Sequence, residues 1–507
     1  MLILNGIHPG EPDGIDASMA WARDLLQSKN ELNKEVVVVI IPVYNIGGCL
    51  NRSPYNRPDQ NGPDEFGSRG NSQYLDLNRD FIKCDSKEAI AFTKIFQWIR
   101  PHLFVDNHVS DGADYPYTMT LATTQHSKLP KAQASYLNNH LEPSLFNKMK
   151  EVGFPMIPYV NVWGWDAGKG WGQFFDSPRY SSGYASLFGC YSFTAETHML
   201  KPYADRVKAT YALMNELYKL SAEYSAEIQS SLANAQQEID TASSWPVYWQ
   251  LDSSRHTKIE YKGYHYHEKK SSISQATIKD YDPQKTYTDS IPFYNHYKAI
   301  RYADIPAAYI IPQGWWNVIK RLKWNNVAMS KLDKDTSIYV QYHKILHFKS
   351  TDKPFEGHHF NTQFSSSVQF DTLTFRKGDY VIPSQQKNKR FIVETLDIQG
   401  QDSYLAWNFF DPILTQKEGY TDYALERIAQ NILQEDTELN ALFNAKLQTD
   451  KEFSMDIHAQ LDFIHRHSRY FEKGYALYPV FKLFVTPPTS PFHKSPTNIS
   501  NPNKQHE

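Results

Sequence analysis

The chain has 507 residues, which is long enough for two or three domains with apolar cores of their own. Its 53 basic and 56 acidic residues leave a net charge of -3, so no basic excess indicates nucleic acid or an anionic membrane as the main partner. Apolar residues make up 41% and charged residues 21%, which excludes intrinsic disorder for most of the chain. No apolar run approaches the roughly 18 residues of a membrane-spanning helix, so we expect no membrane span.

The three cysteines, Cys49, Cys84 and Cys190, exclude a small disulfide-stabilised protein and a cysteine-based zinc ribbon. Their number is odd and no two of them form a CxxC pair, so we expect three buried, small apolar side chains. The first residues also lack the charged region, the apolar core and the cleavage site of a signal peptide.

Strand and helix patterns alternate through the first 110 residues, which predicts an α/β fold. In chain order we expect a strand at 1–7, a helix at 16–27, a strand at 36–44, a helix at 87–99 and a strand at 103–107. Glycine and proline gather in two long segments outside these elements, at 45–70 and 163–183. Long loops in a compact domain are usually functional, so we expect the chemistry to lie among them.

A helical run at 203–234 is followed by a break at 241–246, where we predict the end of a first domain that spans 1–242. Alternating and aromatic segments then indicate a β-rich accessory domain at 246–486. Within it we expect strands at 258–266, 337–342 and 390–395 and a helical segment at about 423–470. Residues 487–507 are rich in Pro, Ser, Thr and Asn, which predicts a disordered tail.

The sharpest local motif is His8-Pro9-Gly10-Glu11, which lies between the first predicted strand and the first predicted helix. A turn there lets an imidazole and a carboxylate three residues apart converge on one cation. Catalytic zinc keeps three protein ligands, for example two His and one Glu, and leaves one position open for water. A second His is then required. His108 is the candidate, because strand ends in open α/β sheets face the ligand crevice.

Further motifs accompany this pair in a fixed order. They are Arg69-Gly70-Asn71, then Asp76-Leu77-Asn78-Arg79, then His108, then Tyr191-Ser192-Phe193-Thr194-Ala195-Glu196. In this order the residues resemble the zinc carboxypeptidases of the carboxypeptidase A type, over about residues 1–200. The resemblance depends on the joint order of five motifs rather than on any one of them. It implies a mixed twisted sheet with helices on both faces, and it says nothing about the chain beyond residue 246.

The resemblance implies that His8, Glu11 and His108 hold one zinc ion. Asp76 would orient His8 through the second ring nitrogen of that histidine. Glu196 would act as general base and acid in a reaction where a zinc-activated water hydrolyses a C-terminal peptide bond.

The remaining matched residues would bind the substrate, a peptide with a free C-terminal carboxylate. Asn78 and Arg79 match the pair that grips this carboxylate, since a planar guanidinium binds a carboxylate through two hydrogen bonds. Arg69 would stabilise the negative charge of the tetrahedral intermediate. Tyr180 is the candidate for the mobile tyrosine that the family places before the catalytic Glu.

Two features depart from the family pattern. The chain has only seven residues before His8, whereas the family normally has further strands and a helix there, so we expect an N-terminally incomplete first domain. If the gene begins upstream, a missing signal peptide would go with the missing strands, and the protein would then be periplasmic or secreted. The segment 181–190 is also shorter than in the digestive enzymes, so the residue that reads the substrate's last side chain is not assigned.

Two other functions stay open from the sequence. A zinc-dependent amidase or deacylase that acts on cell-wall peptides or acyl-amino acids would keep the same metal ligands and the same Glu. A non-catalytic peptide- or glycan-binding protein would instead use the aromatic second half, since the chain has 33 Tyr, 28 Phe and 11 Trp. Histidines of the second half also form pairs that suggest metal sites, but we expect them to be solvated. They are His265 and His267, His358 and His359, and His465 and His467 together with Asp462.

Overall fold

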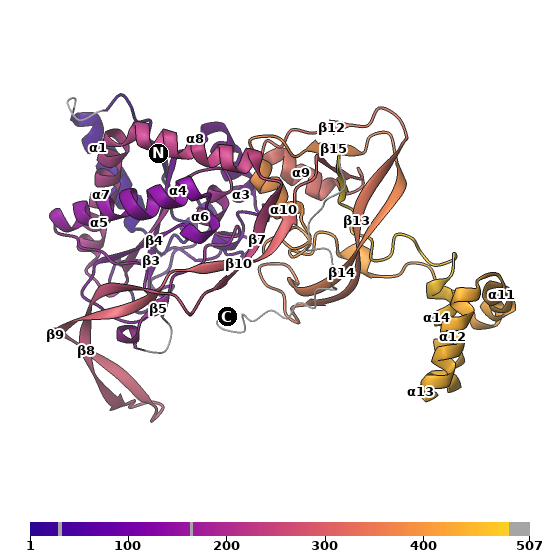
Figure 1. The fold of residues 1–507 in the computed structure, drawn as a ribbon. Coiled ribbons are helices and arrows are strands. Elements are labelled where there is room, and N and C mark those ends of the chain that lie inside the picture. Colours follow the sequence, from indigo (N-terminus) through magenta and orange to yellow (C-terminus); the bar gives the residue numbers. More distant parts are fainter. Residues whose placement is uncertain (29–32, 163–165, 486–507) are drawn as a thin grey trace.

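The computed structural model describes residues 1–28, 33–162 and 166–485 (Figure 1). A five-stranded sheet organises the first half of the protein. The strand order is β2-β1-β3-β6-β4. The strands are β1 (Leu2–Asn5), β2 (Val39–Ile41), β3 (Leu103–Ser110), β4 (Met119–Thr123) and β6 (Tyr191–His198). β1 runs parallel to β2 and β3, β3 runs parallel to β6, and β4 is antiparallel to β6. The sheet is therefore mixed, as predicted.

Helices cover both faces of this sheet because residues along the strands alternate between two apolar clusters. Ile3 of β1 belongs to a cluster with α1, α5, α7 and α8, whereas Leu2 and Leu4 belong to a cluster with α3 and α6. The helices are α1 (Asp13–Gln27), α3 (Lys87–Ile99), α4 (Lys131–Tyr136), α5 (Glu142–Glu151), α6 (Ser181–Ser186), α7 (Tyr203–Glu223) and α8 (Ser225–Thr241). The helix predicted at 87–99 is confirmed. Ser86 caps it by accepting a hydrogen bond from the Ala89 amide.

Several predicted elements differ in length from the observed ones. The strand expected at 36–44 is only three residues long, and α1 begins at Asp13 rather than at residue 16. The helical run at 203–234 is two helices, α7 and α8, which meet at Tyr224. The loops at 45–70 and 163–183 contain short elements, namely α2 (Ile46–Leu50), β5 (Trp171–Gly172) and the first residues of α6.

Among the described residues, three more sheets involve strands of the second half. Its strands are β7 (Ser244–Leu251), β8 (Thr257–Lys270), β9 (Thr277–Tyr294), β10 (Tyr297–Asp304), β11 (Ala308–Ile311), β12 (Ser330–Lys331), β13 (Thr336–Ser350), β14 (Asn361–Phe375), β15 (Tyr380–Pro383) and β16 (Phe481–Leu483), and α9 (Trp316–Trp324) lies among them. β10 pairs with β7. β9 pairs with β8 on one side and with β5 on the other. The other six strands form one sheet in the order β12-β15-β11-β16-β13-β14. The strands predicted at 258–266 and 337–342 are confirmed as parts of β8 and β13.

The strand predicted at 390–395 is wrong, because these residues form the helix α10 (Lys389–Leu396). All eight residues of α10 are buried. Ile392 packs in the cluster of the central sheet, while Val393 packs against Trp245 in a separate cluster. Its central Phe391-Ile392-Val393 run resembles a strand. The polar residues Arg390 and Glu394 lie one turn apart and form a buried ion pair at 2.6 Å, so their burial depends on the helix itself.

The two halves share an apolar core. Leu4 of β1 and Phe96 of α3 belong to the same buried cluster as Tyr309, Phe391 and Trp407 of the second half. The boundary predicted near 242–246 falls at the start of β7, and the separation into a catalytic and an accessory domain stays a prediction. Because side chains of both halves are buried in one cluster, residues of the second half can pack close to the segments that carry the site.

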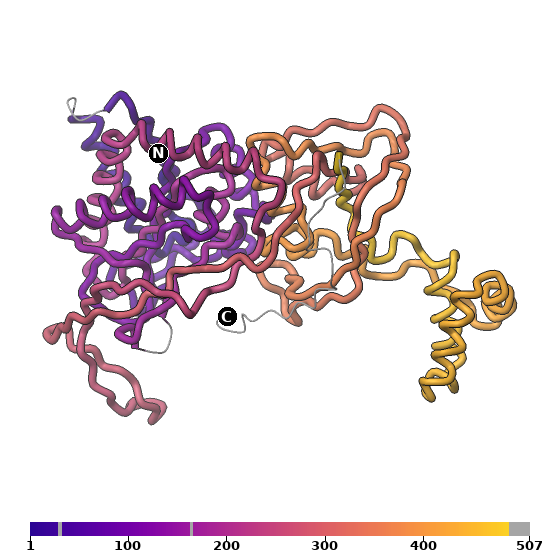
Figure 2. Tube along the Cα trace, in the orientation of Figure 1, coloured from indigo at the N-terminus to yellow at the C-terminus, as the bar shows by residue number. Residues whose placement is uncertain are grey.

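The helical segment predicted at 423–470 consists of four short helices that lie apart from the sheets (Figures 1 and 2). They are α11 (Asp422–Glu435), α12 (Thr437–Thr449), α13 (Lys451–Met455) and α14 (Ile457–His467), and they share a small core of their own. None of the helices in the described residues is long and apolar enough to cross a bilayer. The tail predicted to be disordered, 487–507, lies outside the described residues.

The cysteines are unpaired, but only Cys84 and Cys190 are buried, whereas Cys49 is half-buried. The expectation of three buried thiols is therefore wrong for Cys49.

Candidate metal centre

His8, Glu11 and His108 converge at one edge of the central sheet. His8 follows β1, and His108 lies in the neighbouring strand β3, so parallel pairing brings both residues to the same edge. The Glu11 amide donates a hydrogen bond to the His8 carbonyl, which closes the turn and turns the carboxylate back toward the imidazole. One ligand atom from each of the three residues lies within 4.8 Å of the other two, and each residue is at most 4% exposed.

The nitrogen that faces this cluster from His8 is free to bind a metal. His8 Nδ1 lies 3.2 Å from Glu11 Oε1 and is buried with no hydrogen-bond partner. The opposite nitrogen, Nε2, lies 2.9 Å from Asp76 Oδ1. A buried ring nitrogen without a partner, opposite one fixed by a carboxylate, is the arrangement of a metal-binding histidine. The donor set of two imidazoles and one carboxylate therefore fits zinc.

His108 lies between the Glu11 carboxylate and a second carboxylate, Asp106, which was not among the predicted residues. Its Nδ1 lies 3.1 Å from Glu11 Oε2, and its Nε2 lies 3.0 Å from Asp106 Oδ2. Asp106 in turn accepts a short hydrogen bond from the Ser181 hydroxyl at the start of α6. Asp106 and His108 are two residues apart in one strand and so share a face, and this spacing is the signal that would have found Asp106.

Two arginines surround the Glu11 carboxylate. Arg57, which the sequence reasoning also missed, donates from Nη1 to Glu11 Oε1 at 2.8 Å and from Nη2 to the Val109 carbonyl at 3.3 Å. Burial raises the pKa of Glu11, but the charges of His8 and Arg57 outweigh this effect and hold that pKa well below its ordinary value. Glu11 is therefore ionised, as a metal ligand must be.

Arg69 lies at the mouth of the site. Its Nε and Nη2 lie 3.1 and 2.9 Å from Asp76 Oδ2, and its Nη1 lies 3.7 Å from Glu11 Oε1. The side chain is 52% exposed, so the guanidinium is tethered on one side and open to solvent on the other.

Glu196 lies on β6, directly beside the candidate metal ligand His108. In the parallel register, Glu196 is the partner of His108, so both side chains point to the same face of the sheet. Burial raises the pKa of the Glu196 carboxyl to about 8, and the nearby charges of Glu11 and Asp106 add to the rise while His108 and Arg69 oppose it. A carboxyl group with this pKa can hold and release a proton near neutral pH.

The three candidate substrate-binding residues lie on two segments that the fold brings together. Asn78 and Arg79 lie in the short 3-10 turn Leu77–Arg79, in which the Asn78 amide donates a hydrogen bond to the Asp76 carboxylate at 2.9 Å. Tyr180 precedes α6, and the Arg79 guanidinium lies 4.7 Å from the centre of its ring. The Asn78 side-chain oxygen is buried without a hydrogen-bond partner, which suits a group that waits for a ligand.

The prediction that the paired histidines of the second half are solvated is wrong for two of them. His358 is half-buried, with Nε2 2.7 Å from Asp85 Oδ2, and His465 is 6% exposed in the helical segment. His358 pairs with a residue 273 positions away, and a local pattern cannot reveal such a contact.

No protein-family model matches the chain, and no curated protein matches it either. Solved structures with a similar arrangement include a metallo-carboxypeptidase from Burkholderia cenocepacia, at 17% identity and a TM-score of 0.33, over 44% of this chain and 57% of that one. Csd4 from Helicobacter pylori, described as a D,L-carboxypeptidase, aligns at 12% identity and a TM-score of 0.28, over 75% and 95%. The murein-tripeptide amidase MpaA from Escherichia coli aligns at 15% identity and a TM-score of 0.26, over 43% of this chain and 80% of that one.

Proposed function

We propose that the chain is a zinc-dependent metallocarboxypeptidase that hydrolyses C-terminal peptide bonds. The observation that carries the proposal is the convergence of His8 Nδ1, Glu11 and His108 Nδ1, with Glu196 on the adjacent strand. Two His and one Glu are the ligand set of catalytic zinc with an open fourth position. When bound, zinc supplies a Lewis acid for the substrate carbonyl and lowers the pKa of water toward neutrality.

Glu196 supplies the proton transfers of the reaction. Its carboxylate takes a proton from water during attack on the carbonyl, and it returns that proton to the leaving amine. The raised pKa of Glu196 favours the return of the proton to the leaving amine, because the protonated carboxyl persists near neutral pH. Arg69 supplies fixed positive charge at the mouth of the site, where the carbonyl oxygen becomes negative.

Arg79, Asn78 and Tyr180 select a free C-terminal carboxylate. The planar Arg79 guanidinium can donate two parallel hydrogen bonds to a carboxylate, and the unpartnered Asn78 oxygen can accept one from the adjacent amide of the substrate. Tyr180, stacked on Arg79, shields this ion pair from water and so strengthens it.

The test combines zinc content with hydrolysis of matched peptides that are unblocked or amidated at the C-terminus. It uses the parent, Glu196→Gln, and Glu268→Gln, which alters an exposed residue of β8, as a matched control. We expect about one zinc per chain in all three proteins, and cleavage of unblocked peptides only by the parent and the control. Cleavage that continues when the carboxylate is amidated would favour the amidase alternative. Zinc binding without turnover by the parent would favour a binding protein, and absence of zinc would overturn the proposal.

A further inference from the structure

We infer that the second half of the chain positions Arg79 and Tyr180 for substrate binding, through Glu356 and Asp402. This inference rests on the proposed function, because it assigns Arg79 and Tyr180 to the substrate. Neither Glu356 nor Asp402 touches the metal ligands. Each is a positioning residue that acts through the segment it holds.

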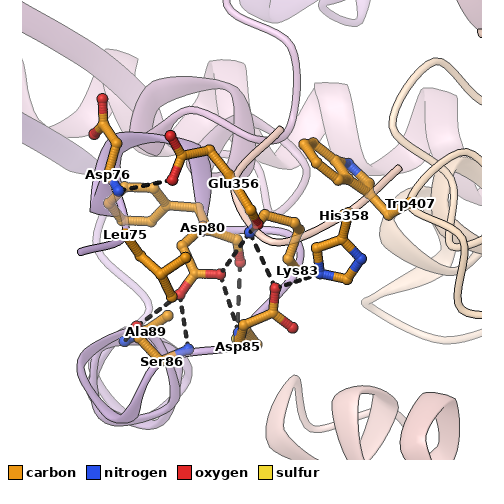
Figure 3. Close-up of polar contacts among 12 residues, drawn as sticks. Leu75, Asp76, Asp80, Lys83, Asp85, Ser86, Ala89, Glu356, His358 and Trp407 are labelled. Carbon is orange, nitrogen blue, oxygen red and sulfur yellow. Dashed lines mark hydrogen bonds and ion pairs between the residues drawn. The ribbon is translucent and has the colours of Figure 1, made fainter. Parts of the chain in front are cut away.

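The first tether joins Glu356 to the segment that carries Arg79. Glu356 lies in the loop between β13 and β14, and its Oε2 accepts a hydrogen bond from the Asp76 amide at 2.7 Å (Figure 3). Asp76 is the residue that caps the turn of Asn78 and Arg79. Glu356 has a φ of 48°, in the left-handed region that a non-glycine residue adopts only when its surroundings impose it. The loop therefore holds Glu356 in a conformation in which its carboxylate contacts the Asp76 amide.

Two charged residues of the first half, Lys83 and Asp85, hold the loop that carries Glu356. Lys83 is fully buried, and its ammonium donates to the Glu356 carbonyl at 3.1 Å and to Asp85 Oδ2 at 3.0 Å. Asp85 also lies 2.7 Å from His358 Nε2, two residues after Glu356 (Figure 3). A buried ammonium is costly unless every donor is satisfied, so this network resists displacement of the loop.

The second tether joins Asp402 to the segment that carries Tyr180. Asp402 is 2% exposed, and it accepts hydrogen bonds from the Arg179 backbone amide and from Arg179 Nε, both at 2.9 Å. Arg179 is the residue before Tyr180. Its guanidinium also lies 4.8 Å from the ring centres of both Phe360 and Trp407. The backbone at Tyr180 is thus fixed by side chains of the second half.

The two tethers meet on the same part of the second half. The Trp407 ring lies 5.2 Å from Lys83 Nζ, and its indole N–H donates to Asp402 Oδ1 at 3.2 Å. Between the two segments of the first half, the Phe81 amide donates to the Arg179 carbonyl at 3.3 Å. Arg79 and Tyr180 stack on each other, and the second half of the chain holds the segment of each one. Loss of either tether should therefore loosen the proposed carboxylate site.

The test measures peptide binding and kinetics with the full chain. Glu356→Ala removes the acceptor for the Asp76 amide, Glu356→Gln keeps an acceptor oxygen of the same reach, and Asp352→Ala alters an exposed acid of the same loop as a control. Asp402→Asn weakens the second tether without removing its volume. Zinc content and the thermal unfolding midpoint are measured for every variant. The Kd for an unblocked peptide is measured by calorimetry in the Glu196→Gln background, where the peptide is not consumed.

We expect Glu356→Ala and Asp402→Asn to raise KM and Kd for unblocked peptides roughly tenfold, with kcat changed less than about twofold and zinc retained. Glu356→Gln should restore values near those of the parent. Equal Kd values for Glu356→Ala, Asp402→Asn and Asp352→Ala would overturn the inference, as would a loss confined to kcat. A fall in unfolding midpoint with unchanged Kd would show a purely structural interface. If the parent itself neither binds nor cleaves unblocked peptides, the proposed function fails instead.

Discussion

Asp76 Oδ1 lies 2.9 Å from His8 Nε2, on the side of the imidazole opposite the unpartnered Nδ1. The same carboxylate group accepts from the Asn78 amide and, through Oδ2, from Arg69. Burial raises the pKa of Asp76, but the charges of His8, Arg69 and Arg79 outweigh it and hold that pKa far below its ordinary value. One ionised carboxylate thus contacts the proposed metal ligand His8 and Arg69, and it also accepts a hydrogen bond from the turn that carries Arg79.

Replacing Asp76 by Asn keeps the shape of the side chain but removes its charge. We expect zinc affinity to fall by about 10- to 100-fold, because the imidazole loses the carboxylate that fixes its orientation. Competition with a chromophoric chelator measures this affinity, and Asp64→Asn on the exposed part of the neighbouring loop serves as the control. Equal zinc affinity in the two variants would contradict the role of Asp76.

Arg79→Lys tests recognition of the terminal carboxylate. A lysine keeps the positive charge but cannot form two parallel hydrogen bonds or stack flat on Tyr180. We expect kcat/KM for unblocked peptides to fall by roughly 100-fold, mainly through KM, with zinc content unchanged. Arg23→Lys, on a side chain that is 63% exposed, is the matched control. A fall in kcat with unchanged KM would contradict the role of Arg79 in binding the substrate carboxylate.

Glu142 gives the fold a pH dependence that is separate from catalysis. Burial raises the pKa of this half-buried carboxyl to about 7, against a weaker opposing hydrogen bond from Thr123. Between its ordinary pKa and about pH 7 the folded chain holds a proton that the unfolded chain releases, so stability falls as pH rises through this window.

Replacing Glu142 by Gln removes this titration. We expect the variant to gain stability relative to the parent between pH 5 and pH 8, by at most about 3 kcal/mol, and to show a higher thermal midpoint at pH 8. Glu151→Gln, at the exposed end of the same helix α5, should show no such gain. Parallel pH profiles for Glu142→Gln and the parent would refute the assignment.

Arg206 joins the sheet edge to the loops around the site. It is fully buried, donates from Nε to Asp13 Oδ2 at 2.8 Å, and bonds the carbonyls of Asn61, Met199, Lys201 and Gly62. Arg206→Met leaves the Asp13 carboxylate buried without its positively charged partner, so we expect a loss of about 3–5 kcal/mol in the free energy of unfolding. Urea unfolding measures this loss, and Arg23→Met should change stability by less than about 0.5 kcal/mol.

The sequence alone determined the elements whose signals are local. The helix α3 follows from its Ser86 cap and its apolar periodicity, and the strands β1 and β3 follow from short buried runs bounded by polar residues. The turn between β1 and α1 that brings Glu11 back toward His8 depends on residues three apart, so the spacing of the motif was sufficient to predict it.

Only the tertiary structure decided which distant residues share the site. Arg57 reaches Glu11 from a loop 46 residues along the chain, through the packing of that loop against the sheet edge. Glu356 contacts Asp76 across 280 residues of sequence, and no periodicity or spacing encodes that contact. The helix α10 was misjudged for the same reason, because its burial on every side is set by partners from both halves. Hydrogen bonds and packing between segments far apart in the chain depend on the complete fold, so a local pattern cannot specify them.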